Sequence, residues 1–224
     1  MRTFMLAVSP ALLILAGGMH PAAQQGTSVR GRVVIGIPVS ARRPSAAYAT
    51  RAVPQPVLAP VSELRHVVVF LKDAPPQRTE PTTVEIRQRD ENFIPRVVAV
   101  PVGSDVRFPN DDPIYHNVFS LSRAKAFNLG RYPRGQSKSE RMTKPGIVKV
   151  FCDIHSHMTA TIMVFNHPWF TMVGEDGRFE LRGVPSGERE ITAWHERLGD
   201  TTVPVRLEAG RATEADFVLP VPRQ

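Results

Sequence analysis

One short stretch, residues 148–164, concentrates side chains that bind soft metal ions. It holds the only cysteine of the chain, Cys152, two of the seven histidines, His155 and His157, and the methionine Met158. Cys152, His155 and Met158 are spaced three residues apart, between apolar runs at residues 147–151 and 160–165 that are typical of strands. A strand that ends in a thiolate, followed by a tight loop with an imidazole and a thioether, would bring three donor atoms around one point. The spacing therefore predicts the ligand loop of a metal site.

A fourth donor must come from elsewhere in the chain, and the best candidate is His116. It follows the turn-forming residues 110–113 and begins an alternating apolar pattern. Two imidazoles and a thiolate in a plane, with a weak axial thioether, form the ligand set of blue-copper electron-transfer sites. Soft sulfur ligands favour Cu(I) and imidazoles suit Cu(II), so this set predicts one copper ion that is held in both oxidation states. The predicted ligands are His116, Cys152, His155 and Met158.

The second histidine of the loop, His157, is the ambiguous one. We expect it to be exposed, while a role as an alternative ligand or as a ligand of a second metal stays open. A lone cysteine is usually a small buried apolar residue. It is the order of four donor types between predicted strands that favours a metal site over this simpler interpretation.

Residues 82–166 resemble a cupredoxin, and the loop from Cys152 to Met158 resembles the short ligand loop of amicyanin and pseudoazurin. The segments 108–110, 116–119 and 145–152 fall where that family has its upstream ligand and the turn before its cysteine strand. The resemblance implies a Greek-key β-sandwich that carries one type 1 copper. It also implies that Asn117 helps to tie the two ligand segments together.

The same resemblance implies a route for an electron. In cupredoxins the loop histidine, here His155, reaches the surface through an apolar patch and is the usual exit for the electron. We expect Met158 and Ala160 to help form that patch. The function implied is the transfer of single electrons between redox partners. A copper-binding or copper-delivery module without an electron-transfer role is the alternative.

An enzymatic role is the third possibility, because multicopper oxidases and copper nitrite reductases also contain cupredoxin domains. Those enzymes connect the ligand cysteine to further copper through neighbouring histidines, one of them immediately before the cysteine. Here Phe151 precedes Cys152, Asp153 follows it, and the chain has too few histidines for a trinuclear cluster. We therefore expect a protein that is not an enzyme.

The N-terminus predicts export. A short basic start is followed by an apolar run at residues 4–18 and then by small residues, which is typical of a secretory signal peptide, here residues 1–23. An uncleaved N-terminal anchor is the alternative, and no later segment is apolar enough to span a membrane. An exported chain with one cysteine forms no internal disulfide, and metal ligation would protect its thiol. A periplasmic or otherwise exported location follows.

Charge is unevenly distributed along the chain. The formal net charge is +7, and between positions 123 and 149 eight basic residues face the single acid Glu140. A local positive field would speed the encounter with a protein partner that is acidic near the contact. A solvated basic loop without a partner is the alternative. Nucleic acid is an improbable partner, because export separates the chain from it and no nucleic-acid-binding motif is present.

The rest of the chain predicts strands and turns rather than helices. Residues 28–37 and 66–72 are strand-like, 38–61 form a loop rich in Pro, Ala and Arg, and 122–145 form a basic connection that contains Gly and Pro. Residues 169–219 contain a hairpin signal at Asp176 and Gly177 and alternate apolar with polar residues. This part resembles the carboxypeptidase regulatory-like, or transthyretin-like, β-sandwich. The fold class is therefore all-β, with a cupredoxin sandwich and a second, smaller Ig/transthyretin-like sandwich.

Because that second segment is too short for a complete sandwich, its missing strands must lie elsewhere. We expect residues 28–73 and 167–220 to form one discontinuous unit into which residues 82–166 are inserted. This arrangement predicts that residues 66–72 lie beside the C-terminal strands. Two consecutive domains, with the early strands added to the cupredoxin, are the alternative. Trp194 and His195 are expected to have structural roles.

Overall fold

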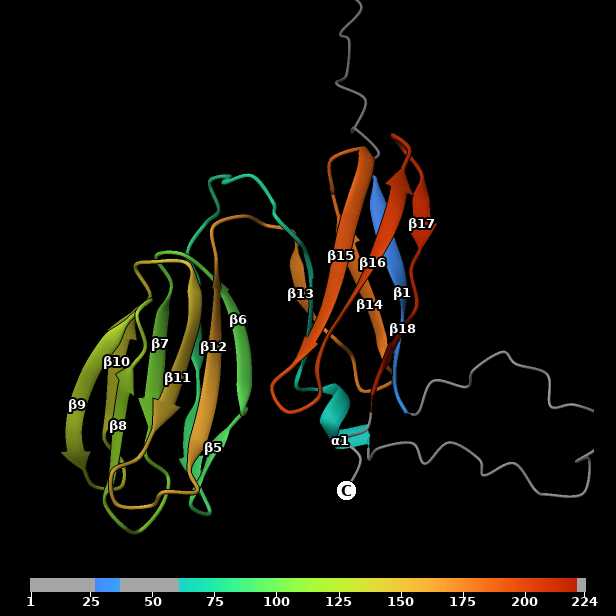
Figure 1. Cartoon of the computed structure of the whole chain (residues 1–224). Helices are drawn as coiled ribbons and strands as arrows, with labels where there is room; N and C mark the ends of the chain where they lie inside the picture. Colours follow the sequence, from blue (N-terminus) through green and yellow to red (C-terminus); the bar gives the residue numbers. More distant parts are fainter. Residues whose placement is uncertain (1–26, 37–60, 221–224) are drawn as a thin grey trace, which may run out of the picture.

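The computed structural model in Figure 1 describes residues 27–36 and 61–220. The predicted signal peptide at residues 1–23 and nearly all of the loop predicted at 38–61 lie outside the described residues. Almost every element is a β-strand, and the only helix of the described part is α1 (Val61–Leu64). The all-β prediction is therefore confirmed. The strands form two units that lie side by side (Figure 1).

The first unit, which we call the site unit, comprises strands β3 to β12, residues 83–165. Its two sheets enclose one apolar core that includes Phe108, Met142 and Ile162, all of them fully buried. A three-stranded sheet has the order β10 (Ser137–Arg141), β7 (Asp105–Pro109) and β3 (Thr83–Glu85). A five-stranded sheet has the order β6 (Val97–Pro101), β12 (Thr159–Phe165), β11 (Gly146–Phe151), β8 (His116–Leu121) and β9 (Ala126–Tyr132). A hairpin is formed by β4 (Arg87–Arg89) and β5 (Asn92–Ile94).

One prediction for this unit needs correction. The basic segment 122–145 was expected to be a connection, but it forms β9 and β10, each at the edge of its sheet. Charged residues suit edge strands because they discourage pairing with other chains, and they also hide the strand pattern in the sequence. Residues 83–90 form two short strands, β3 and β4, with the fully buried Ile86 between them.

The second unit, which we call the flanking unit, comprises residues 28–35, 61–71 and 170–219. Two four-stranded sheets enclose an apolar core to which Val29, Leu71 and Phe217 contribute. In one sheet β1 (Ser28–Ile35) pairs with β14 (Arg178–Arg182), β17 (Ala212–Glu214) and β18 (Phe217–Leu219). The other has the order β13 (Phe170–Met172), β2 (Val67–Leu71), β15 (Gly187–His195) and β16 (Gly199–Leu207).

Strand β2 therefore lies between two C-terminal strands, the pairing that a discontinuous unit requires. Val69 is opposite Ala193 in β15 and opposite Thr171 in β13. In β2 alternate residues point to opposite faces. Val67, Val69 and Leu71 enter the core of the flanking unit, whereas Val68 and Phe70 face the site unit. This explains why the segment is apolar at every position.

An apolar layer joins the two units, where Val68 and Phe70 meet Val97, Met163 and Phe165. Strand β12 is therefore buried on both faces, because Ile162 and Val164 point instead into the core of the site unit. A polar cluster around the partly buried Glu196 extends the contact between the units. Glu196 accepts hydrogen bonds from Lys149 Nζ at 2.6 Å, Thr161 Oγ1 at 2.9 Å and Arg96 Nε at 3.1 Å.

Candidate metal centre

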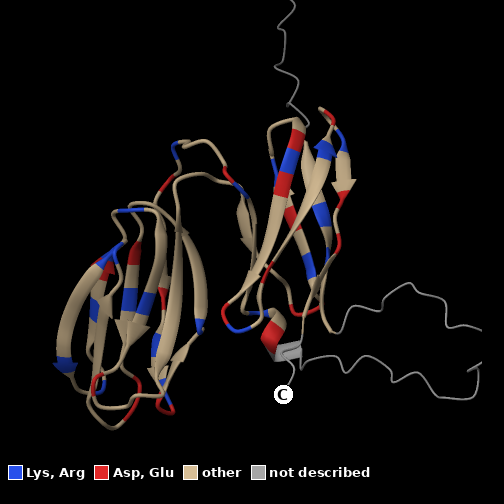
Figure 2. Cartoon of the chain, in the orientation of Figure 1, with Lys and Arg blue, Asp and Glu red and all other residues tan. Residues whose placement is uncertain are grey.

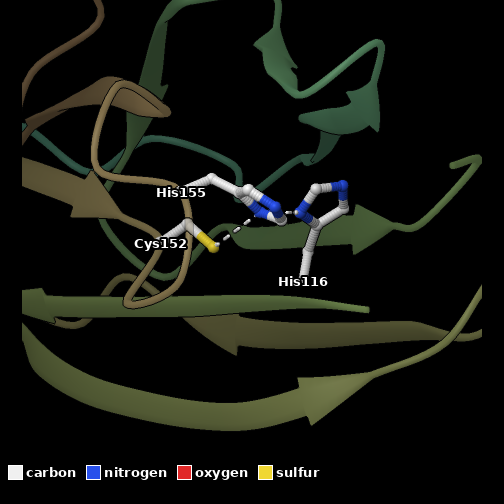
Figure 3. A group of neighbouring side chains, drawn as sticks. All are labelled: His116, Cys152 and His155. Atoms are coloured by element: carbon white, nitrogen blue, oxygen red, sulfur yellow. Dashed lines mark hydrogen bonds between the residues drawn. The ribbon is translucent and has the colours of Figure 1, made fainter. Parts of the chain in front are cut away.

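Three elements bring the predicted donors together at one end of the site unit. His116 is the first residue of β8, Cys152 follows the last residue of β11, and His155 lies in the loop that leads to β12. β8 and β11 are antiparallel neighbours, with Phe119 opposite Phe151. This register places the beginning of β8 beside the end of β11. His116 and His155 are consequently neighbours in space, although they are 39 positions apart in the sequence (Figure 3).

The three donor atoms converge within a small volume. Nδ1 of His116 lies 3.0 Å from Nδ1 of His155, which in turn lies 3.9 Å from Sγ of Cys152 (Figure 3). All three atoms are within 4.8 Å of one another. Two donors that are each about 2.0–2.3 Å from a common ion have separations of this size. Two imidazoles and a thiol thus fit a copper or zinc ion by their geometry and their chemistry.

Burial differs among the three side chains in a way that matters for access. His116 is fully buried and Cys152 is 4% exposed, whereas His155 is only partly buried. Cys152 is the only cysteine, and its thiol is free. Its sulfur accepts a hydrogen bond from the backbone N–H of Asn117 at 3.4 Å. The centre is therefore closed toward the core, and only His155 leads toward the surface.

The orientation of His116 is fixed by Asp112, which the sequence analysis did not identify. Nε2 of His116 lies 2.8 Å from Oδ2 of Asp112, a carboxylate that is only 5% exposed. Because a carboxylate accepts, Nε2 carries the proton and Nδ1 presents its lone pair to Cys152 and His155. The only feature of the sequence that pointed to this role of Asp112 was its position four residues before His116.

The pKa of Asp112 reflects this environment. Burial alone would raise the pKa of the carboxyl group. Hydrogen bonds from the backbone N–H of Glu91, from His116 and from the backbone N–H of Asp90 outweigh burial and hold the pKa below its usual value. Asp112 is therefore a carboxylate at neutral pH, as an acceptor for His116 must be.

Met158, the fourth predicted ligand, is 1% exposed and belongs to the same apolar cluster as Cys152. Its backbone N–H donates to the carbonyl of His155 at 2.9 Å and closes the turn between them. The close cluster itself consists of His116, Cys152 and His155. Ligation by Met158 stays a prediction.

Asn117 contacts the centre through its backbone rather than its side chain. Besides the bond to the sulfur of Cys152, its Nδ2 donates to Oδ1 of Asn128 in β9 at 2.8 Å. The tie between the two ligand segments is thus the main-chain bond, while the side chain attaches β8 to β9.

His157 lies outside the cluster. Its side chain is 58% exposed, and Nε2 is 3.7 Å from Oε2 of Glu91. Its ring centroid lies 6.2 Å from that of His155. The expected exposure is confirmed, and a role as an alternative ligand stays a prediction.

The residues that were expected to form an apolar surface patch around His155 do not form one. Met158 and Ala160 are each 1% exposed and face the core, so the prediction that they form a surface patch is wrong. The turn that the Met158 N–H closes directs that side chain inward, and Ala160 follows with the same orientation in β12. The exposed apolar residues that flank the ligands in sequence are Ile114, Tyr115 and Ile154, at 38%, 58% and 38%.

The basic residues between positions 123 and 149 are partly neutralised. Figure 2 shows acidic residues interspersed with them over the site unit. Four of the eight basic side chains form ion pairs, which weakens the positive field that the sequence suggested. The pairs are Lys125 with Glu140, Arg131 with Asp153, Arg141 with Asp105 and Lys149 with Glu196.

A second group of metal-capable side chains lies in the flanking unit. Glu63, His66 and His195 have donor atoms within 4.8 Å of one another. Nε2 of His195 is 3.1 Å from Oε2 of Glu63, and Arg197 donates to the other oxygen of the same carboxylate. Sequence reasoning gave His195 a structural role and did not connect it to Glu63 or His66, because these residues lie 132 and 129 positions away along the chain.

No protein-family model matches this sequence, and no curated protein matches it either. Solved structures with a similar fold include the copper-containing nitrite reductase of Thermus scotoductus SA-01, with 24% identity and a TM-score of 0.36. That overlap covers 42% of this chain, which spans a quarter of the nitrite reductase chain. A purple cupredoxin from Nitrosopumilus maritimus has 25% identity and a TM-score of 0.31, with 34% of this chain and 84% of that chain covered.

An amicyanin mutant in the Cu(I) form is also similar, with 19% identity and a TM-score of 0.35 over 37% of this chain and 82% of that chain. The structural neighbours are thus cupredoxins, but the overlaps cover less than half of this chain at low TM-scores. The case for a metal centre here therefore depends on His116, Cys152 and His155 themselves. Among the described residues, no helix has both the length and the apolar character needed to cross a bilayer.

Proposed function

We propose that this protein is an exported type 1 copper protein that carries single electrons between protein redox partners. The observation that carries the proposal is the convergence of His116 Nδ1, His155 Nδ1 and Cys152 Sγ within 4.8 Å of one another. Bound there, copper would supply one-electron chemistry between Cu(II) and Cu(I). The buried Met158 would hold the copper together with these three residues.

The residues of the chain would hold the geometry constant during transfer. His116 is fixed from behind by Asp112, and the sulfur of Cys152 is fixed by the N–H of Asn117. Ligands held in this way would need little rearrangement between the two oxidation states, which favours rapid electron transfer. His155, the partly buried ligand, would connect the centre with the surface.

The proposed contact with a redox partner is the apolar rim formed by Ile114, Tyr115 and Ile154. These residues adjoin the ligands and are well exposed. An acidic partner is less well supported, because half of the basic residues that suggested it already pair with carboxylates. We propose no catalytic activity for this protein.

The proposal also includes the location and the domain organisation. Residues 1–23 would serve as the signal peptide for export to the periplasm or an equivalent compartment. Residues 28–73 and 167–220 would form a discontinuous transthyretin-like sandwich that flanks the cupredoxin unit at 82–166. The pairing of β2 with β13 and β15 supports this division.

Copper delivery without electron transfer is the second candidate, and His157 favours it. This exposed imidazole lies beside His155 and close to the carboxylate of Glu91, where it could receive an ion from the centre. An electron carrier should keep its copper, whereas a delivery module should release it.

Repeated redox cycling in the presence of a Cu(I) chelator distinguishes the two functions. We expect the copper-loaded protein to be reduced and reoxidised several times with its copper retained, and His157→Ala to behave in the same way. Transfer of copper to the chelator in the reduced state, slowed by His157→Ala, would contradict the electron-carrier proposal and favour delivery.

A further inference from the structure

Asp112 is a carboxylate near the candidate centre that accepts several hydrogen bonds. Its Oδ1 accepts the backbone N–H of Asp90 at 2.7 Å, and its Oδ2 accepts the backbone N–H of Glu91 at 2.9 Å. The same Oδ2 lies 2.8 Å from Nε2 of His116. Three donors from two separate segments thus meet one carboxylate that is 5% exposed.

The turn that supplies two of these donors has an unusual backbone. Asp90 and Glu91 connect β4 and β5, and both have positive φ angles, 52° and 51°. Residues other than glycine seldom adopt this conformation, because it is less stable than the usual backbone conformations. The two bonds to Asp112 help to maintain it. The turn and the carboxylate therefore hold each other in place.

The segment that carries Asp112 is fixed from the other side by Asn110. Oδ1 of Asn110 accepts the backbone N–H of Asp112 at 2.9 Å. Its Nδ2 donates to the carbonyls of Ile114 at 2.9 Å and Tyr132 at 3.0 Å. Asn110 is 1% exposed, so these bonds are protected from water. The carboxylate thus has little freedom to move away from His116.

A carboxylate that accepts a hydrogen bond from a ligand histidine has two effects on that histidine. It fixes the tautomer and the ring orientation, and it increases the basicity of the ligating nitrogen. A stronger and more negative donor stabilises Cu(II) more than Cu(I), because the oxidised ion has the higher charge. We propose that Asp112 is a positioning residue that biases the centre toward its oxidised state and so lowers its reduction potential. This inference rests on the proposed function of the site.

The test compares Asp112→Asn with Asp111→Asn in the full chain. Both variants remove one negative charge, and Asp111 pairs with Arg87 and Arg89 without contacting His116. An asparagine at 112 still accepts a backbone N–H, but its amide group presents a donor to the N–H of His116. The reduction potential of the copper-loaded proteins is then measured. It distinguishes an effect of Asp112 through its hydrogen bond to His116 from a purely structural role of Asp112.

We expect Asp112→Asn to weaken the binding of Cu(II) about tenfold or more relative to the binding of Cu(I). This size is typical of substitutions at residues that are hydrogen-bonded to a metal ligand. Each tenfold change raises the reduction potential by about 59 mV. Asp111→Asn should leave the potential close to that of the wild type. Equal potentials for the wild type and Asp112→Asn, or equal shifts in the two variants, would overturn the inference. A wild type that takes up no copper would instead refute the proposed function itself.

A second measurement applies even if Asp112→Asn does not fold. In the wild-type protein loaded with Cu(I), nitrogen-15 NMR should show His116 protonated at Nε2, with a slowly exchanging proton coupled to the carboxylate of Asp112. A His116 ring protonated at Nδ1, or an Nε2 proton that exchanges freely with water, would also overturn the inference.

Discussion

The site unit and the flanking unit each contain a compact group of metal-capable side chains, but the two groups differ in what their nitrogens do. In the site unit, Nδ1 of His116 and Nδ1 of His155 face each other, with the sulfur of Cys152 beside them. The proton of His116 lies on Nε2, on the far side of the ring, and is donated to the carboxylate of Asp112. The lone pair of His116 Nδ1 therefore points toward the space that it shares with His155 and Cys152.

In the flanking unit the protein itself uses the ring nitrogens of His195. Nδ1 accepts the backbone N–H groups of Arg197 and Leu198, each at 3.2 Å. The proton is then on Nε2, which donates to Glu63, and the same carboxylate also binds Arg197. A metal ion would have to displace this proton and compete with a guanidinium. Proximity of histidines and acids is thus insufficient for a metal site, because free lone pairs are also required.

Substitution of one histidine in each group should give the largest contrast. His155→Ala removes a proposed ligand and should lower copper affinity by at least about 100-fold. This loss exceeds the usual effect of substituting a residue that is only hydrogen-bonded to a ligand. His66→Ala removes a partly exposed histidine of the flanking group and should leave copper affinity unchanged. Isothermal titration with Cu(II) measures both. Equal losses would refute the distinction between the two groups.

His157→Ala serves as the matched control within the ligand loop. Its ring lies close to His155 but at the exposed rim, so copper affinity should stay near that of the wild type. If His157→Ala abolished binding and His155→Ala did not, the assignment of the loop ligand would be wrong.

Glu196, next to His195, sharpens the comparison because its charge stabilises the fold rather than binding an ion. Burial would raise its pKa, but hydrogen bonds from Lys149 and Thr161 and the charge of Arg96 hold it lowered. Glu196→Gln should reduce the free energy of unfolding by about 1.5–3 kcal/mol at pH 7, the value of hydrogen bonds to a charged group. Chemical denaturation of the metal-free protein measures this loss.

The effect of Glu196→Gln should depend on pH in a defined direction. A carboxyl whose pKa is lowered by folding stabilises the fold above its unfolded pKa, and this stability is lost as the pH falls through the folded pKa. The difference between wild type and variant should therefore shrink in acid. If the difference in free energy of unfolding between wild type and Glu196→Gln stayed constant from pH 7 to pH 3, the stabilising role of the charge would be contradicted. The same holds if the variant were as stable as the wild type at pH 7.

His195 should make a smaller contribution of its own to acid sensitivity. Burial lowers its pKa, and Glu63 offsets only part of this effect. Folding therefore resists protonation of His195, and stability should fall as the pH drops from about 6.5 toward the lower folded value, by about 1.4 kcal/mol for each unit of pKa difference. His167, whose pKa burial also lowers, acts in the same direction.

Melting temperatures of the metal-free wild type and of His195→Gln, measured from pH 7.5 to 5, test this expectation. Glutamine can still accept a backbone N–H and does not titrate, so its melting curve should depend less steeply on pH. An equally steep decline in the variant would show that His195 does not cause it.

The sequence predicted that His116, Cys152 and His155 lie together, because residue types and their spacing can be recognised without a structure. Cys152, His155 and His116 were recognised by their chemistry and by the strands around them. Asp112 was missed, because its importance depends on which nitrogen of His116 it meets. The burial of Met158 and Ala160 was missed for a similar reason, since the turn closed by a main-chain bond decides which way those side chains point.

The strands were predicted where an apolar run is bounded by turn residues, as in β1, β2 and β8. Strands β9 and β10 were missed because edge strands carry polar and charged residues on their open side. The sequence also gave no indication of the polar cluster around Glu196. Its partners Arg96, Lys149 and Thr161 lie 35 to 100 positions away and meet it only through packing of the two units.

The visible absorption spectrum after addition of one equivalent of Cu(II) tests the central claim most directly. The wild-type protein should develop an intense thiolate-to-copper band that bleaches with ascorbate and returns on reoxidation. Cys152→Ser should lack the band, while His66→Ala should retain it. A colourless wild-type protein, or a band that persists in Cys152→Ser, would contradict a copper–thiolate centre at His116, Cys152 and His155.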